Sequence, residues 1–357
     1  MKKNLKKIAA FVVALSFVMG TIAFGATEAK ADDKVYSLAL TTHNAESNCT
    51  VVAMQDWADK LREESDGRLD ITIYAGGTIA NANDAFTVTG AGGADLCWIT
   101  VTQNAGALPL MTYSSISTLG FTNAYQPTYM MVETFKQFPE MQEEFAAQNT
   151  RCLAVYGMSP AWLLSNGEDF STVEDYQGKI VMSSNANFVS MLEGMGCSIT
   201  GDLPTQIADS MSKSIYKSLL IDFQAAMAFH VDELIDRAYT YNYGTTISFV
   251  AINLDVYNSL PEDLQALLDD NFEYLSYKSA ELGNENIQEC LDARNYELIE
   301  VSEDVQAKLD QVAEETIVPQ YVEAANAAGA DGQAIYDFAK AKLEEAKELY
   351  GEEYDWK

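Results

Sequence analysis

The sequence predicts an α/β protein of two domains, each built on a mostly parallel sheet. Short apolar runs alternate along the chain with segments whose apolar residues recur at helical spacing. Polar and glycine-containing turns separate the two kinds of segment. The 357 residues also exceed what one small hydrophobic core needs, which favours two domains.

The first 31 residues have the pattern of a secretory signal peptide. Four lysines among the first seven residues precede an apolar stretch, and Ala29-Lys30-Ala31 has the small-x-small pattern of a cleavage site. An uncleaved membrane anchor is the alternative, but the cleavage pattern favours removal. Because the first cysteine is Cys49, no lipid anchor is expected at the mature N-terminus. We therefore expect a secreted protein of a periplasm or similar extracytoplasmic space.

The elements of the first half alternate between strand and helix. Residues 35–40 form an apolar run, which predicts a buried strand, and apolar residues at helical spacing over 54–61 predict a helix that ends near Gly67. Apolar and polar residues then alternate over 69–73, as in a half-buried strand. By the same patterns we expect helices at 84–89 and 128–148 and strands at 94–100 and 151–158. Repeated strand–helix units favour parallel pairing.

The second half continues this alternation and ends in helices. Pro261 opens a long helix over 261–275, because Glu262 and Asp263 in its first turn suit the helix dipole. Most of the last 55 residues are acidic and have helical spacing. The other elements expected here are strands at 179–182 and 247–252 and helices at 188–195 and 206–213.

The charge of the chain argues against binding to nucleic acid or anionic lipid, and its cysteines argue against a disulfide-rich fold. The chain has 22 Lys and Arg against 53 Asp and Glu, a net charge of −31 that repels nucleic acid and anionic lipid. Its five cysteines are widely spaced and form no CxxC pair, so no disulfide framework is expected, although a single disulfide stays open.

Catalytic motifs are absent from the sequence. It has two histidines and no HExxH, GxSxG or phosphate-loop pattern, and no cofactor or metal is expected. His43 and Cys49 are an imaginable nucleophile pair, but nothing in the sequence orients them. The pattern therefore predicts ligand binding between two domains rather than catalysis.

An ordered set of motifs carries a family resemblance. Trp57 lies in a helix that leads to Asp66-Gly67-Arg68, and the next strand ends in Tyr74-Ala75-Gly76-Gly77. Gly92 to Asp95 precede the third strand, and the stretches STVEDYQGKIV and NLDVYNSLPEDLQALLDD follow in consistent order. This order, over roughly residues 35–320, resembles the DctP-type solute-binding proteins of TRAP transporters.

The resemblance implies a type II periplasmic-binding-protein fold and a receptor that captures a solute by hinge closure. It further implies delivery of the solute to a TRAP-type membrane permease driven by an ion gradient, with no enzymatic activity and no cofactor. We expect a monomer. The domains expected are 32–155 plus about 245–285, and about 156–244 plus 286–325, with a C-terminal helix at 326–357.

One family feature is missing. The family usually places an Arg at the end of the strand that follows the DYQG turn, where its guanidinium grips the ligand carboxylate. Here the matching position is Val181 or Met182, and no Arg occurs between Ala154 and Asp236. Lys217 could supply another cation, although a solvated lysine is the preferred interpretation.

Candidate ligand-binding residues follow the predicted strand ends, because ligands of open α/β sheets bind at the carboxyl ends of strands. Each has a structural alternative: a backbone-bonded loop histidine for His43, core packing for Trp98, and turn formation for the polar residues after residue 182. His230 is a weaker candidate. The predicted set is His43, Asn44, Trp98, Thr100, Gln103, Met158, Trp162, Ser183, Asn185, Asn187 and Gln224.

These residues predict a pocket with aromatic and thioether walls and uncharged hydrogen-bonding groups. We expect a neutral ligand, or an aromatic or otherwise apolar organic acid held by His43, hydroxyls and amides. Two alternatives of function stay open. One is a ligand sensor for a membrane signalling receptor, and the other is a secreted enzyme on the same fold.

Overall fold

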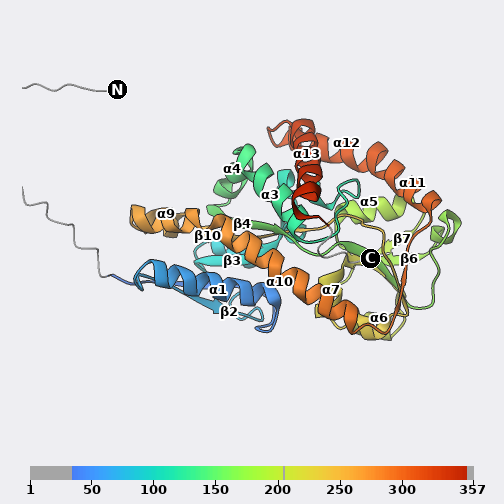
Figure 1. The fold of residues 1–357 in the computed structure, drawn as a ribbon, viewed down its shortest axis with the longest axis horizontal. Coiled ribbons are helices and arrows are strands. Elements are labelled where there is room, and N and C mark those ends of the chain that lie inside the picture. Colours follow the sequence, from blue (N-terminus) through green and yellow to red (C-terminus); the bar gives the residue numbers. More distant parts are fainter. Residues whose placement is uncertain (1–33, 204–205, 352–357) are drawn as a thin grey trace, which may run out of the picture. The chain divides into compact units, whose positions relative to one another are not determined.

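Two sheets form the framework of the computed structural model, which describes residues 34–203 and 206–351 (Figure 1). The five-stranded sheet has the order β2 (Leu69–Tyr74), β1 (Tyr36–Thr41), β3 (Leu96–Thr100), β10 (Ile247–Asn253) and β4 (Thr150–Gly157). The six-stranded sheet has the order β11 (Glu297–Ile299), β9 (Arg237–Tyr239), β5 (Ala161–Ser165), β8 (Ser218–Asp222), β6 (Ile180–Met182) and β7 (Ser198–Thr200).

Both sheets are mostly parallel, as expected, and each contains one reversed strand. β10 pairs antiparallel with β3 and β4, and β5 pairs antiparallel with β8 and β9. The reversed strands are those that the chain enters as it crosses between sheets. Residues 158–160 lead from β4 into β5, and residues 240–246 lead from β9 into β10.

Helices cover both faces of the five-stranded sheet. The helices of this part are α1 (Cys49–Glu64), α2 (Ala85–Gly90), α3 (Tyr125–Gln137), α4 (Glu140–Ala147), α8 (Leu254–Ser259), α9 (Glu262–Asp270) and α10 (Phe272–Asp292). In β3, Leu96 and Trp98 join a core with α1, whereas Cys97 and Ile99 join the core on the other face. This two-sided burial explains why β3 is an unbroken apolar run.

Shorter helices accompany the six-stranded sheet, and long ones end the chain. They are α5 (Ala186–Gly194), α6 (Ile207–Ser212), α7 (Phe223–Ala228), α11 (Glu303–Val312), a π-helical turn (Ala313–Ile317), α12 (Val318–Ala327) and α13 (Gly332–Tyr350). α13 packs on α3, and α10 packs on β4 and also on α7 (Figure 1). The expected helical C-terminal region is thus confirmed up to the end of α13 at Tyr350.

Two expectations about helices were wrong, and the strands β5, β7, β8, β9 and β11 were not expected. The helix expected at 128–148 is two helices, because Pro139 starts a new one after Phe138 adopts an extended conformation. The helix expected at 261–275 is also divided, since α9 ends and α10 begins at Asn271. The strand β5 was not expected at all, although its sequence AWLLS is completely buried.

The signal peptide and the domain boundaries stay predictions, whereas the state of the cysteines is resolved. The expected signal peptide, residues 1–31, lies outside the described residues. The described residues from Val35 onward form one compact unit, and the expected domain boundaries stay a prediction. All five cysteines are free thiols, so the single disulfide that the sequence left open is not formed.

Candidate ligand-binding cleft

A cavity of about 130 Å³ lies where strand ends of the two sheets meet. Residues that follow β1 and β3 line one side, and residues that end or follow β6 and β8 line the other. Thr246, which leads into the reversed strand β10, completes the wall. The cavity therefore has the position at which open α/β sheets bind ligands.

Nine of the predicted ligand-binding residues line this cavity. They are His43, Asn44, Trp98, Thr100, Gln103, Met158, Ser183, Asn185 and Gln224. They come from five separate segments of the chain, which the two sheets bring together. Their role in ligand binding stays a prediction, but their common location follows from the strand-end rule that selected them.

The wall from the five-stranded sheet combines aromatic and amide groups. His43 lies against Trp98 with a ring-centroid distance of 5.4 Å and an interplanar angle of 48°. The Trp98 indole N–H donates to the Tyr156 hydroxyl, so Trp98 is both core and cavity wall. Burial lowers the pKa of His43, and its Nδ1 is buried without a hydrogen-bond partner in the described residues.

The wall from the six-stranded sheet is fixed by local hydrogen bonds. The Ser183 hydroxyl donates to the Leu220 carbonyl over 3.0 Å, and the Asn185 side chain caps α5 by accepting from the amide of Asn187 over 2.9 Å. Gln224 Nε2 donates to Cys49 Sγ over 2.6 Å and to Asn286 Oδ1 over 3.3 Å. Packing thus holds the polar groups of this wall in defined directions.

Two predicted residues lie outside this cavity. The Asn187 side chain donates to the Thr112 carbonyl over 3.0 Å and to Ser115 Oγ over 2.9 Å, so it joins α5 to the segment before α3. Trp162 lines a different cavity of about 530 Å³, whose other walls include Tyr241, Asn242 and Lys347.

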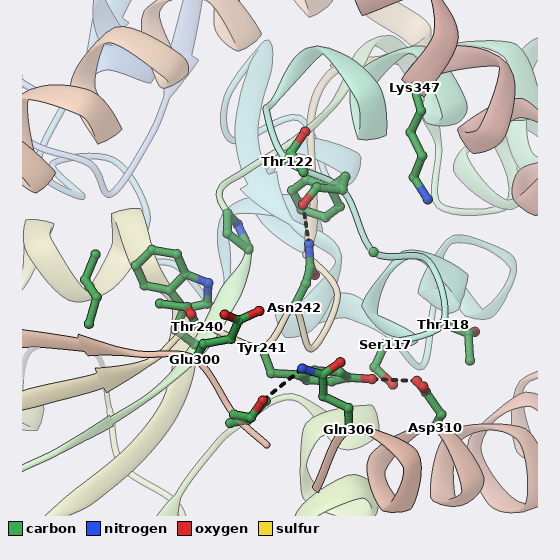
Figure 2. Close-up of a pocket in the computed structure, with 16 residues that line it drawn as sticks. Ser117, Thr118, Thr122, Thr240, Tyr241, Asn242, Glu300, Gln306, Asp310 and Lys347 are labelled. Carbon is green, nitrogen blue, oxygen red and sulfur yellow. Dashed lines mark hydrogen bonds between the residues drawn. The ribbon is translucent and has the colours of Figure 1, made fainter. Parts of the chain in front are cut away.

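Figure 2 shows this larger cavity. The Tyr241 hydroxyl donates to Asp310 over 2.6 Å across one wall, and Lys347 extends from α13 toward the other lining residues. The cavity is flanked by the ends of β9 and β11 and by the C-terminal helices, with no strand end of the five-stranded sheet among its described lining residues. It therefore lacks the two-sheet wall of the smaller cleft.

The expectation of an uncharged pocket was wrong. Asp202 and Asp222 line the cleft, and both were missed in the sequence. Asp222 directly follows the apolar run Leu219–Ile221, so the strand-end rule would have found it had β8 been recognised. Burial raises the pKa of Asp222 to about 6, whereas a hydrogen bond from the Ser210 hydroxyl is the main cause that lowers the pKa of Asp202.

The two positions that match the missing Arg, Val181 and Met182, differ in their surroundings. Met182, at the end of β6, lines the cleft, whereas Val181 is buried elsewhere in the core. None of the described residues that line the cleft is Lys or Arg. Lys217 is exposed and lies outside the cleft, which agrees with the preferred interpretation of a solvated lysine. The exposed His230 also lies outside the cleft.

Residues 34–203 and 206–351 contain no group of three His, Cys, Asp or Glu side chains placed to hold a metal ion. Among these residues, no helix has the length and apolar character needed to span a membrane.

Comparison with known proteins identifies the family. The sequence profile of the bacterial extracellular solute-binding proteins, family 7 (DctP), matches residues 40–324. The fold is similar to a TRAP solute-binding protein of Rhodoferax ferrireducens in complex with benzoate, with a TM-score of 0.77 at 20% identity over 89% of this chain and 100% of that one.

Two further structures have the same fold. A TRAP periplasmic solute-binding protein of Bordetella bronchiseptica with bound mandelate gives a TM-score of 0.77 at 16% identity over 87% of this chain and 99% of that one. An extracytoplasmic solute receptor of Bordetella pertussis binding pyroglutamic acid gives a TM-score of 0.75 at 19% identity, over 86% of this chain and 100% of that one. The type II periplasmic-binding fold is thereby confirmed, and the chain belongs to family 7 of the bacterial extracellular solute-binding proteins, the DctP family of TRAP transporters.

Proposed function

We propose that this solute-binding protein captures a small organic molecule in the cleft between its two sheets and delivers it to a TRAP-type membrane permease. The observation that carries the proposal is the cavity at the meeting point of strand ends from both sheets, in a chain of this family. The related structures hold benzoate, mandelate and pyroglutamic acid, which are compact ring-bearing molecules. The volume of the cavity, about 130 Å³, suits a ligand of that size.

The two crossing segments suit capture by hinge closure. Residues 158–160 and 240–246 pass between the sheets, and Met158 and Thr246 from these segments also line the cleft. A ligand that contacts both walls would stabilise a closed arrangement relative to an open one. Closure would in turn present one continuous surface to a permease.

The state of Cys49, whose thiol contacts the cleft residue Gln224, supports binding rather than catalysis. Burial raises the pKa of the Cys49 thiol to about 12, and Cys49 accepts a hydrogen bond from Gln224 rather than pairing with His43. Only a thiolate is strongly nucleophilic, so this thiol is unreactive at neutral pH. The protein is proposed to act as a monomer without enzymatic activity.

Secretion agrees with this role. The sequence pattern of residues 1–31 predicts a cleavable signal peptide, and the absence of a cysteine near Ala31 predicts a mature protein without a lipid anchor. We propose that the mature receptor diffuses in the periplasm between solute and permease.

Native mass spectrometry of the purified protein tests the proposed function. We expect one small molecule to leave the protein on denaturation, and reconstituted permease to transport that molecule only when the receptor is present. Capture of no small molecule from cell extract or from a library of organic solutes would contradict the proposal. The variant Asn83→Ala should capture the same molecule as the native protein, because the exposed Asn83 side chain lies outside the cleft.

A further inference from the structure

The charge of the cleft is negative, which disfavours the binding of a carboxylate. Its charged side chains, among the described lining residues, are the carboxylates of Asp202 and Asp222. His43 is the one basic side chain among them, and burial lowers its pKa, so the imidazole is neutral at physiological pH. A ligand carboxylate here would meet like charge instead of a guanidinium.

Asp222 is the most constrained of these groups. It is 8% exposed, and Oδ1 accepts from the Thr246 amide over 3.2 Å and from the Thr245 hydroxyl over 3.4 Å. Oδ2 accepts one hydrogen bond from the described residues, from the Thr246 hydroxyl over 3.0 Å. A carboxylate offers about four acceptor positions, so Asp222 retains capacity for one more donor. No ion pair within the described residues neutralises it.

The hydroxyl groups of the cleft direct their protons into the protein. Thr102 donates to Thr246 over 3.3 Å, and Thr246 donates onward to Asp222. Thr100 donates to Gln103 Oε1, and Ser183 donates to the Leu220 carbonyl. Because these protons are already used, the hydroxyls can offer a ligand only their lone pairs. The wall of the cleft is therefore richer in acceptors than the residue types alone suggest.

The remaining surface of the cleft is apolar. Met182 stands at the end of β6, where the family resemblance expects the Arg, and Trp98 and Phe188 are nearly completely buried beside the cavity. A dry cavity of ~150 Å³ can hold a benzene molecule, so the volume of about 130 Å³ suits a single ring with a small substituent.

We propose that the cleft selects a compact, ring-bearing ligand that donates an N–H group to Asp222 and carries no free carboxylate. This inference rests on the proposed function and narrows it. The donor is an uncharged amide or lactam N–H or the N–H of a protonated amine. Both donate to a carboxylate acceptor, and the amine adds charge complementarity. Gln103 and Asn185 supply side-chain amides for the other polar edge of the ligand.

A matched series of probes tests the inference by isothermal titration calorimetry at pH 7.5. Benzoate, benzamide and benzylamine share one ring and differ in the polar group, and equivalent trios on five- and six-membered rings extend the series. We expect an amide or an amine to bind at least about tenfold more tightly than the matched carboxylate, a difference of about 1.4 kcal/mol. Equal or tighter binding of the carboxylate would overturn the inference and leave the proposed function intact.

Variants of the two key positions sharpen the test. Asp222→Asn is expected to lower the affinity for the N–H probe about tenfold or more. Met182→Arg is expected to raise the affinity for the carboxylate probe above that of the native protein. Asp209→Asn is the matched control, because Asp209 is exposed on α6 and pairs with Lys213.

Circular dichroism and thermal melting establish that each variant is folded. Unchanged affinity for the N–H probe in folded Asp222→Asn would overturn the inference. If no amide, amine or carboxylate binds at millimolar concentration, the inference fails. If native mass spectrometry then also finds no captured molecule, the proposed function fails with it.

Discussion

The carboxylate of Asp222 accepts hydrogen bonds from both the backbone N–H and the hydroxyl of Thr246, over 3.2 Å and 3.0 Å. Asp222 ends β8 in the six-stranded sheet, and Thr246 directly precedes β10 in the five-stranded sheet. These bonds therefore join the two sheets at the wall of the ligand-binding cleft. They also couple the ionisation of one buried side chain to the stability of the junction.

The ionisation of Asp222 predicts a pH dependence of stability. Burial raises its pKa from 3.8 to about 6, so between these values the folded state binds more protons than the unfolded state. The contribution of this group to the free energy of unfolding therefore falls as pH rises from about 4 to 6. A shift of roughly two pKa units corresponds to about 3 kcal/mol.

Asp222→Asn removes this titration, and urea unfolding at pH 4 and pH 7 measures the effect. We expect the stability of the variant relative to the native protein to improve by up to about 3 kcal/mol between the two pH values. Comparing the two proteins at each pH cancels the contributions of the other acids. A relative stability that does not change with pH would show that Asp222 titrates normally.

Trp98 predicts a spectroscopic signal for ligand binding. Its indole lines the cleft and lies 5.4 Å from the His43 ring, so a bound ligand would alter its surroundings. We expect ligand addition to change the intrinsic fluorescence, and Trp98→Phe to lose most of that change. Trp57→Phe is the control, because Trp57 is fully buried in the core with α1 and lies outside the cleft. An undiminished signal in Trp98→Phe would place the ligand elsewhere.

Substitution of Asn187 distinguishes a structural role of this side chain from a role in ligand binding. Its side chain donates to the Thr112 carbonyl and to Ser115 Oγ and does not line the cleft. We expect Asn187→Ala to lower the free energy of unfolding by about 1–2 kcal/mol, because it removes two hydrogen bonds. Its ligand affinity should stay within about twofold of the native value, since a change of that size is well under 1.4 kcal/mol. A large loss of affinity without loss of stability would assign Asn187 to the ligand instead.

The contrast between Asn185 and Asn187 shows how far sequence can predict a site. Both follow the same strand, and the strand-end rule selects both, but helical rotation directs one toward the cleft and the other toward Thr112. The same limit applies to Trp162, whose strand β5 reverses direction on crossing to the second sheet. Local patterns predict which residues lie near a strand end, and tertiary pairing decides which cavity each side chain enters.

Asp222 was missed for a related reason. Its strand is five residues long, and two of its neighbours in the sheet, β5 and β6, come from earlier parts of the chain. Periodicity over so few residues does not distinguish a buried strand from a buried helix. In contrast, β1, β2 and β4 have six to eight residues, and each was predicted to within two residues of its bounds. The five-residue strand β3 was also predicted, because the glycine-rich turn before it marks where its apolar run begins.

The cysteines allow a direct chemical test of the core. The structure has five free thiols, and burial raises the pKa of Cys49, Cys97 and Cys197 to about 12. Because thiolate is the reactive form, we expect slow reaction of the native protein with Ellman's reagent at pH 8. Unfolding in guanidinium without reductant should release all five thiols to the reagent. A total that rises only after reduction would reveal a disulfide, in contradiction to the five free thiols of the structure.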